Sequence, residues 1–189
     1  MRFAIRVLVF LGLLWAGTLV LGSTAERWLI YPFDGTRIAP GSVGLGDVQE
    51  MSFRSDGETL IAWIAAPKPG KPTVFYLHGN AGNLAARAGR FRQFRTRGYG
   101  LFALAYRGSG GSSGTPSEAA ILRDVRAAWD THRARFPDIA PGTIILYGES
   151  LGTAATLSLF DTGPWGSDPP GGVIVEAPFT SIADMAQAQ

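Results

Sequence analysis

Short apolar runs alternate with longer segments of helical period from residue 73 onward, and this alternation is the strongest constraint on the fold. The apolar runs are Thr73–Leu77, Gly100–Tyr106, Thr143–Tyr147 and Gly172–Glu176. The segments between them with one apolar side are Asn83–Arg97, Ser117–Phe136 and Leu151–Phe160. Strands that alternate with helices favour a mostly parallel sheet covered by helices on both faces. The sequence therefore predicts an α/β fold.

The residues before this alternation have a different pattern. Asp47–Arg54 and Thr59–Ala66 have strand character, and the Ser55-Asp56-Gly57 turn between them predicts a β-hairpin. Pro32–Gly46 shows no period and is typical of a linker or surface loop. At the other end, Ser181–Asp184 has the pattern of a helix start. We therefore expect a linker over residues 28–46 and a globular part over residues 47–189.

The N-terminal end is apolar. Val7–Ala25 carries no charge and follows Arg2 and Arg6, which favours a signal anchor over residues 1–27 with one transmembrane helix. Arginines before the span would place everything after it on the non-cytoplasmic side, with residues 7–25 in the lipid bilayer. A signal peptide cleaved near Ala25, giving a secreted protein, is the main alternative. A buried helix of a soluble protein is the weaker one, because the run lacks a polar stripe.

Composition excludes several classes of function. The 189 residues contain no cysteine, which excludes thiolate zinc sites, iron–sulfur clusters and cysteine nucleophiles. The net charge is only +2, and no dense run of basic residues is present, so nucleic acid is a poor candidate for a partner. No metal or cofactor is predicted. The five arginines within residues 83–97 could face anionic lipid, but an ordinary solvated helix face is the favoured interpretation.

Gly148-Glu149-Ser150-Leu151-Gly152 matches the G-x-S-x-G pattern, in which a strand turns sharply into a helix and exposes a serine oxygen. The match lies directly between a predicted strand and a predicted helix, so Ser150 is the candidate nucleophile. Gly148 and Gly152 are needed because side chains at so tight a turn would clash with neighbouring elements. A second match at residues 110–114 is centred on Ser112, but loop residues precede it and a proline follows soon after. We interpret Ser112 as a loop residue.

His78-Gly79-Asn80 follows the strand Thr73–Leu77, where an acyl-transfer enzyme of this layout places a loop that donates to the oxyanion. The backbone N–H of Asn80, together with that of Leu151 after the nucleophile, is the predicted oxyanion hole. The alternative is that this segment is only a flexible turn before a helix.

Four motifs in one order carry a resemblance to a known superfamily: FYLHGNAGN, AYRGSGGSSGTPSE, LYGESLGTAATLSL and VIVEAPFTS. From about Trp28 to its end the chain resembles the α/β-hydrolases, and more narrowly the single-pass, membrane-anchored α/β-hydrolase-domain proteins described as serine aminopeptidase-like. The resemblance implies an eight-stranded, mostly parallel sheet and hydrolysis of an ester, thioester or amide through an acyl-serine, with a small acyl, ester or peptide substrate. It also implies a structural, hydrogen-bonding role for His78.

The catalytic partners of Ser150 are missing from their expected place. In this fold an acid and then a histidine follow the serine in the chain. Acids follow Ser150 in this sequence, namely Asp161, Asp168, Glu176 and Asp184, but no histidine does. The chain has one further histidine, His132, beside arginines on what reads as a solvated helix face.

These gaps lead to the expectation of an incomplete fold with about six of eight strands. The strand Gly172–Glu176 would be left as an apolar, unprotected edge. Because of this edge and the missing base, we expect the chain expressed alone to aggregate or fold poorly and to show no esterase activity. The alternative function is that of a catalytically dead hydrolase-fold protein that serves as a binding or scaffold module at the membrane.

Overall fold

The computed structural model describes residues 12, 15, 29–163 and 165–178. The chain divides into two compact units, Met1–Pro32 and Phe33–Gln189, and the second contains the whole sheet. Apart from residues 12 and 15, the predicted membrane span lies outside the described residues, as does the predicted helix start at residues 181–184. Within the described part of the chain, no helix combines the length and the apolar character that crossing a membrane requires.

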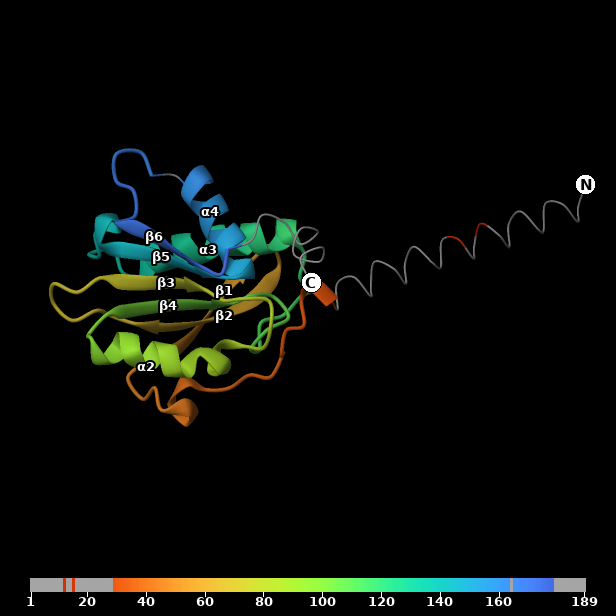
Figure 1. Ribbon diagram of the computed structural model, residues 1–189, viewed down its shortest axis with the longest axis horizontal. Coiled ribbons are helices and arrows are strands. Elements are labelled where there is room, and N and C mark those ends of the chain that lie inside the picture. Colours follow the sequence, from red (N-terminus) through yellow and green to blue (C-terminus); the bar gives the residue numbers. More distant parts are fainter. Residues whose placement is uncertain (1–11, 13–14, 16–28, 164, 179–189) are drawn as a thin grey trace, which may run out of the picture. The chain divides into compact units, whose positions relative to one another are not determined.

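Six strands form one sheet in the order β1-β2-β4-β3-β5-β6 (Figure 1). The strands are β1 (Gln49–Ser55), β2 (Glu58–Ala65), β3 (Thr73–Leu77), β4 (Gly100–Ala105), β5 (Ile144–Glu149) and β6 (Gly172–Glu176). In the described part of the sheet domain the α-helices are α2 (Ala88–Thr96), α3 (Glu118–Arg135) and α4 (Leu151–Thr162), and the short 3-10 helices are η1 (Pro40–Val43), η2 (Leu84–Arg87) and η3 (Pro141–Thr143). Within the described residues the predicted strands and helices are confirmed with small shifts at their ends, except that the helix predicted over Asn83–Arg97 is divided into η2 and α2.

The sheet is mixed, whereas the sequence predicts a mostly parallel one. β2 pairs antiparallel with both β1 and β4, while β3 pairs parallel with β4 and β5, and β5 pairs parallel with β6. The predicted hairpin accounts for the antiparallel edge. At its turn Asp56 has a φ of 47° and Gly57 a φ of 83°, the backbone that suits a two-residue hairpin loop.

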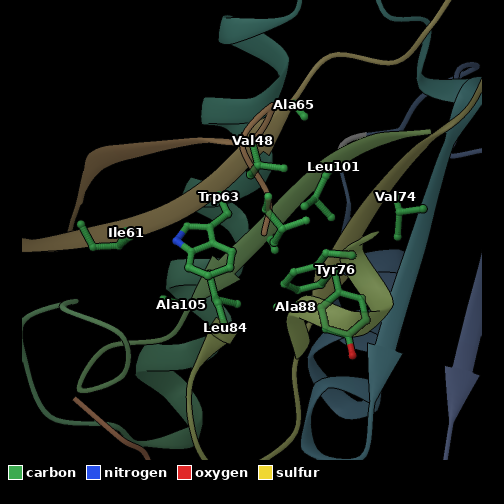
Figure 2. Packing of buried hydrophobic residues seen from close by; sticks show 13 residues of the cluster. Val48, Ile61, Trp63, Ala65, Val74, Tyr76, Leu84, Ala88, Leu101 and Ala105 are labelled. Carbon is green, nitrogen blue, oxygen red and sulfur yellow. The ribbon is translucent and has the colours of Figure 1, made fainter. Parts of the chain in front are cut away.

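Helices cover both faces of the sheet, as predicted. On one face, α2 packs against apolar side chains of β2, β3 and β4, and Figure 2 shows Trp63, Tyr76, Leu84 and Ala88 within this cluster. The opposite face carries the alternate strand residues. There Phe75 stacks on Phe102 with ring centroids 5.0 Å apart, and Trp129 of α3 meets the edge of Phe75. The period-two alternation of the strands thus supplies two separate cores.

Residues 33–46, predicted as part of a linker, have contacts with the sheet domain. Phe33 forms a parallel β-bridge with Gly82, and its ring stacks on that of Tyr106 at 5.7 Å. Leu45 is buried in the α2-side cluster. The lack of a regular period therefore reflects irregular structure rather than an absence of packing.

His132 is buried, so its interpretation as a surface residue is wrong. Its ring lies among the aromatic rings of Phe75, Phe102, Trp129 and Phe136. Neither ring nitrogen has a hydrogen-bond partner among the described residues. The surface position was predicted from the neighbouring arginines, but the helical spacing of His132 predicts burial. His132 follows Ala128 by four residues and Trp129 by three, which places it on the buried stripe of α3.

The free energy of unfolding is expected to decrease as the pH is lowered, because His132 is buried. Desolvation, and to a smaller extent the Arg133 cation, lowers the pKa of His132 from 6.5 to about 4. The unfolded chain therefore binds a proton at a higher pH than the folded chain does. The contribution of His132 to the free energy of unfolding is therefore fully present above the unfolded pKa of 6.5. As the pH falls from there toward the folded pKa of about 4, this contribution decreases by up to about 1.4 kcal/mol per pH unit.

We expect the free energy of unfolding of the wild-type protein, measured in urea, to decrease from about pH 7 to about pH 5. The same decrease should be smaller in His132→Leu. Burial lowers the pKa of His78 to about 4 as well, so the variant retains part of the slope. A slope in His132→Leu equal to that of the wild type would contradict the prediction.

Candidate active site

Ser150 lies at the turn between β5 and α4, as the motif predicts. Its backbone adopts a φ of 49° and a ψ of −114°, a conformation that a residue with a side chain rarely takes. Its N–H donates to the carbonyl of Glu176 at 2.8 Å, and its carbonyl accepts from the N–H of Thr153 at 2.8 Å. These bonds tie the turn to β6 on one side and to the first turn of α4 on the other.

The two motif glycines are required by close packing. A Cβ atom on Gly152 would lie 2.0 Å from the carbonyl oxygen of Leu77, at the end of β3. A Cβ atom on Gly148 would lie 2.6 Å from the carbonyl oxygen of Gly152 and 2.6 Å from Oγ1 of Thr156. Helix α4 therefore approaches the sheet at a distance that only hydrogen atoms at these positions allow. This approach brings the turn with Ser150 next to the end of β3.

The predicted oxyanion loop reaches the same place. β3 and β5 are parallel neighbours, with Leu77 opposite Gly148, so the loop after β3 and the turn after β5 leave the sheet at one edge. A Cβ atom on Gly79 would lie only 3.4 Å from Cβ of Ser150. Asn80 follows in this loop and is partly buried, and Leu151 is the first residue of α4. The structure thus places Gly79 and Asn80 of the loop next to Ser150 and Leu151 of the turn.

His78 is fully buried beneath this loop. Its ring packs against Tyr106 at 4.4 Å and against Phe33 at 5.6 Å, and its Nδ1 lies 2.7 Å from the carbonyl oxygen of Gly79, to which it donates in the Nδ1–H tautomer. Burial first, and then the Arg87 cation, lowers its pKa to about 4. It makes no hydrogen bond to Ser150. The ring is therefore packed and hydrogen-bonded inside the fold, and its structural role stays a prediction.

Ser112, the serine of the second motif match, is buried in a loop. Its Oγ accepts from the N–H of Ile61 at 2.9 Å and donates to the carbonyl of Ala105 at 2.7 Å. Gly111 in the same loop has a φ of 91°, and a side chain there would collide with Arg37. The prediction that Ser112 is a structural loop residue agrees with these contacts.

The structure also shows two groups of polar side chains that sequence reasoning missed. Arg87 makes an ion pair with Glu149, the residue before the nucleophile, and Tyr76 donates a hydrogen bond to the same carboxylate. Next to it, Arg90 pairs with Glu176, which also accepts from Tyr147. The sequence signal was an acid at the end of an apolar strand, Glu149 in β5 and Glu176 in β6.

The arginines of residues 83–97 therefore do not form a simple solvated face. Arg87 pairs with Glu149 and Arg95 with Asp47, and both arginine side chains are only 12% exposed. Burial opposes the ionisation of Glu149, but the hydrogen bonds from Arg87 and Tyr76 outweigh it, so the pKa of its carboxyl lies below the ordinary value.

The acids after Ser150 are not arranged as catalytic partners in the described part of the chain. Hydrogen bonds from Arg90 and Tyr147 lower the pKa of Glu176, and its carboxylate is occupied by them. Asp161 and Asp168 are exposed, and Asp184 lies outside the described residues. Among the described residues, no three acids or histidines lie close enough together to hold a metal ion.

Comparisons with known proteins show the family of this chain. Residues 68–189 match the family model described as serine aminopeptidase, S33. The chain is 34% identical over 185 residues to the α/β hydrolase domain-containing protein WAV2 of Arabidopsis thaliana. This alignment covers 94% of this chain and 59% of WAV2. The chain is also 34% identical over 119 residues to the lysophosphatidylserine lipase ABHD12 of Xenopus tropicalis. That alignment covers 62% of this chain and 30% of ABHD12.

A solved structure shares the fold. The crystal structure of an α/β hydrolase from Vibrio vulnificus superposes with a TM-score of 0.66 at 23% identity, over 76% of this chain and 50% of that one. The chain spans about half the length of the curated relatives that it matches. The family model matches more than half of the chain, and the sheet and the serine turn are consistent with it. The chain therefore belongs to the serine aminopeptidase S33 family of α/β-hydrolase-fold proteins.

Proposed function

We propose that this chain carries the nucleophile and the oxyanion hole of a serine hydrolase that cleaves an ester, thioester or amide. The observation that carries the proposal is the backbone of Ser150, held at a φ of 49° between β5 and α4 beside the loop of Gly79. Such a turn costs on the order of 1–3 kcal/mol. Strain of this kind is found where it presents a functional side chain, and here that side chain is a serine hydroxyl.

The proposed reaction proceeds through an acyl-serine. Oγ of Ser150 attacks the substrate carbonyl carbon while a base takes its proton, and the N–H groups of Asn80 and Leu151 stabilise the oxyanion that forms. The leaving group departs with a proton from the base, and water then releases the acyl group. Neither His78 nor His132 is placed to act as this base, since both are buried and neither contacts Ser150. The reaction therefore requires a base that these two histidines do not supply.

The proposed substrate is an ester with an acyl chain, in a protein anchored to a membrane by residues 7–25. The relative ABHD12 is named as a lipase of lysophosphatidylserine, and that name favours an ester over an amide substrate for this chain. The uncharged run Val7–Ala25 and the preceding Arg2 and Arg6 support the anchor, with the sheet domain on the non-cytoplasmic side. Retention in the membrane pellet after an alkaline wash tests the anchor, and release would favour the secreted alternative.

The second candidate function is a hydrolase-fold scaffold without catalytic activity. The burial of both histidines favours it, because a serine without a base is a weak nucleophile. This candidate shares the fold and the anchor with the first and differs only in the reactivity of Ser150.

Labelling with a fluorophosphonate probe separates the two functions, since the probe reacts with an activated serine. We expect the protein made from its complete open reading frame to be labelled, with the label on the peptide that contains Ser150. The Ser150→Ala variant should remain unlabelled. A cooperatively folded wild-type protein that takes up no label would overturn the hydrolase proposal and favour the scaffold.

A further inference from the structure

The side chain of Arg87, the last residue of η2, connects two segments of the site. Its Nε donates to Oε2 of Glu149 at 3.2 Å and its Nη2 donates to Oε1 at 3.1 Å. Its Nη1 donates to the carbonyl of Ala81 and, at 3.4 Å, to that of Asn83. One planar guanidinium therefore holds the loop after β3 and the end of β5 at the same time.

These two segments carry the two predicted oxyanion donors. Asn80 directly precedes Ala81 in the loop, and Leu151 lies two residues after Glu149. The donors belong to different elements, so their separation depends on contacts between those elements. A Cβ atom on Gly79 would lie 3.4 Å from Nη2 of Arg87, from Oε1 of Glu149 and from Cβ of Ser150. The ion pair thus lies directly against the position where the loop meets the nucleophile.

We propose that Arg87 is a positioning residue that sets the geometry of the oxyanion hole by fixing the Ala81 and Asn83 carbonyls to the Glu149 carboxylate. This inference rests on the proposed function and names a residue that acts through Asn80 and Leu151, without contact with the substrate. An oxyanion hole depends on donors that are fixed before the reaction, so loosening the connection between them lowers the stabilisation of the transition state.

Arg95 of α2 provides a matched control for the simpler possibility that Arg87 only stabilises the fold. Both side chains are 12% exposed, and both form an ion pair. Arg95 also donates to backbone carbonyls, those of Ala66 and Tyr99. Among the described residues, its hydrogen bonds go to Asp47, Ala66 and Tyr99, and none goes to the loop of Asn80 or the turn of Ser150. Replacing Arg95 therefore removes a similar set of bonds without loosening the predicted oxyanion hole.

The experiment compares kcat and KM for a p-nitrophenyl ester in the protein made from its complete open reading frame. In Arg87→Gln we expect kcat to fall by about 100-fold with KM unchanged, because the lost interactions matter only in the transition state. In Arg95→Gln we expect kcat to stay within about threefold of the wild-type value, even if the melting temperature falls as much as it does in Arg87→Gln. Arg87→Lys should recover the melting temperature but not kcat, since an ammonium group cannot reach the carboxylate and both carbonyls together.

A second readout does not depend on turnover. Amide hydrogen exchange in the peptides that cover residues 79–83 and 149–151 should become faster in Arg87→Gln and stay as in the wild type in Arg95→Gln. If Arg87→Gln does not fold, Glu149→Gln breaks the same ion pair while keeping the size of the side chain, and it should lower kcat in the same way.

The outcomes distinguish this inference from the proposed function. Absence of Ser150-dependent turnover in the wild-type protein would overturn the proposed function, and this inference with it. Normal turnover in the wild type combined with equal kcat values for Arg87→Gln and Arg95→Gln would overturn only the role of Arg87.

Discussion

Replacing Ser150 with alanine should lower kcat for an ester substrate by about 10⁶-fold in the protein made from its complete open reading frame, the loss measured when a serine protease loses its nucleophile. Ser150 is the residue that the β5–α4 turn presents beside the predicted oxyanion loop. The same substitution at Ser112 should leave kcat unchanged. The two serines sit in identical sequence patterns, so the pair tests whether the local structure, rather than the pattern, defines the nucleophile.

Ser112→Ala should instead affect stability. Its hydroxyl connects the N–H of Ile61 in β2 to the carbonyl of Ala105 in β4 inside the fold. Removing it leaves two buried backbone groups without a partner and should lower the free energy of unfolding by about 1–3 kcal/mol. Urea unfolding of the two variants measures this. A loss of kcat in Ser112→Ala without a loss of stability would show that the assignment of the two serines is wrong.

The second large effect is expected at Asp124 of α3. Its carboxylate is fully buried and accepts hydrogen bonds from Nε and Nη2 of Arg107 and from the hydroxyl of Ser55, each at 2.6 Å. These bonds connect α3 to the loop after β4 and to the end of β1. In Asp124→Asn the Arg107 cation, also buried, loses its counter-charge. Urea unfolding should show a loss of about 3–5 kcal/mol, because the cost arises from the unpaired buried charge.

The matched control is the ion pair between Arg123 and Asp56, one residue earlier in the same helix. Both of its side chains are more than half exposed. Arg123→Gln should change the free energy of unfolding by less than about 1 kcal/mol, because water and salt screen an exposed pair. Similar losses in the two variants would contradict the expectation that burial decides the effect.

Much of this fold follows from local sequence patterns. The hairpin of β1 and β2 was predictable because Asp56 and Gly57 tolerate the positive φ values that a tight turn requires. The start of α3 was predictable because Ser117 caps it, with its hydroxyl accepting from the N–H of Ala120. Such signals act within a few residues, so a single sequence contains them in full.

Ser150 was predictable for the same reason. A strand, a glycine and a helix adjoin it in the chain, and that local pattern predicts the turn. The pattern around Ser112 lacks them. Gly79 and Asn80 were predictable as the residues after a buried strand, because parallel neighbours bring their ends to one edge of the sheet.

Other features depend on residues far apart in the chain. Arg87 and Glu149 are separated by 62 positions, and nothing near either one indicates its partner. His132 was misread because its sequence neighbours are charged, whereas its spatial neighbours are the aromatic rings of two strands and its own helix. The sequence by itself determined the helices, the strands and the place of Ser150 at the turn after β5, because local backbone preferences and period decide these. Only the tertiary structure decided which charges are paired and that both histidines are buried, because electrostatic and desolvation energies depend on distances through space.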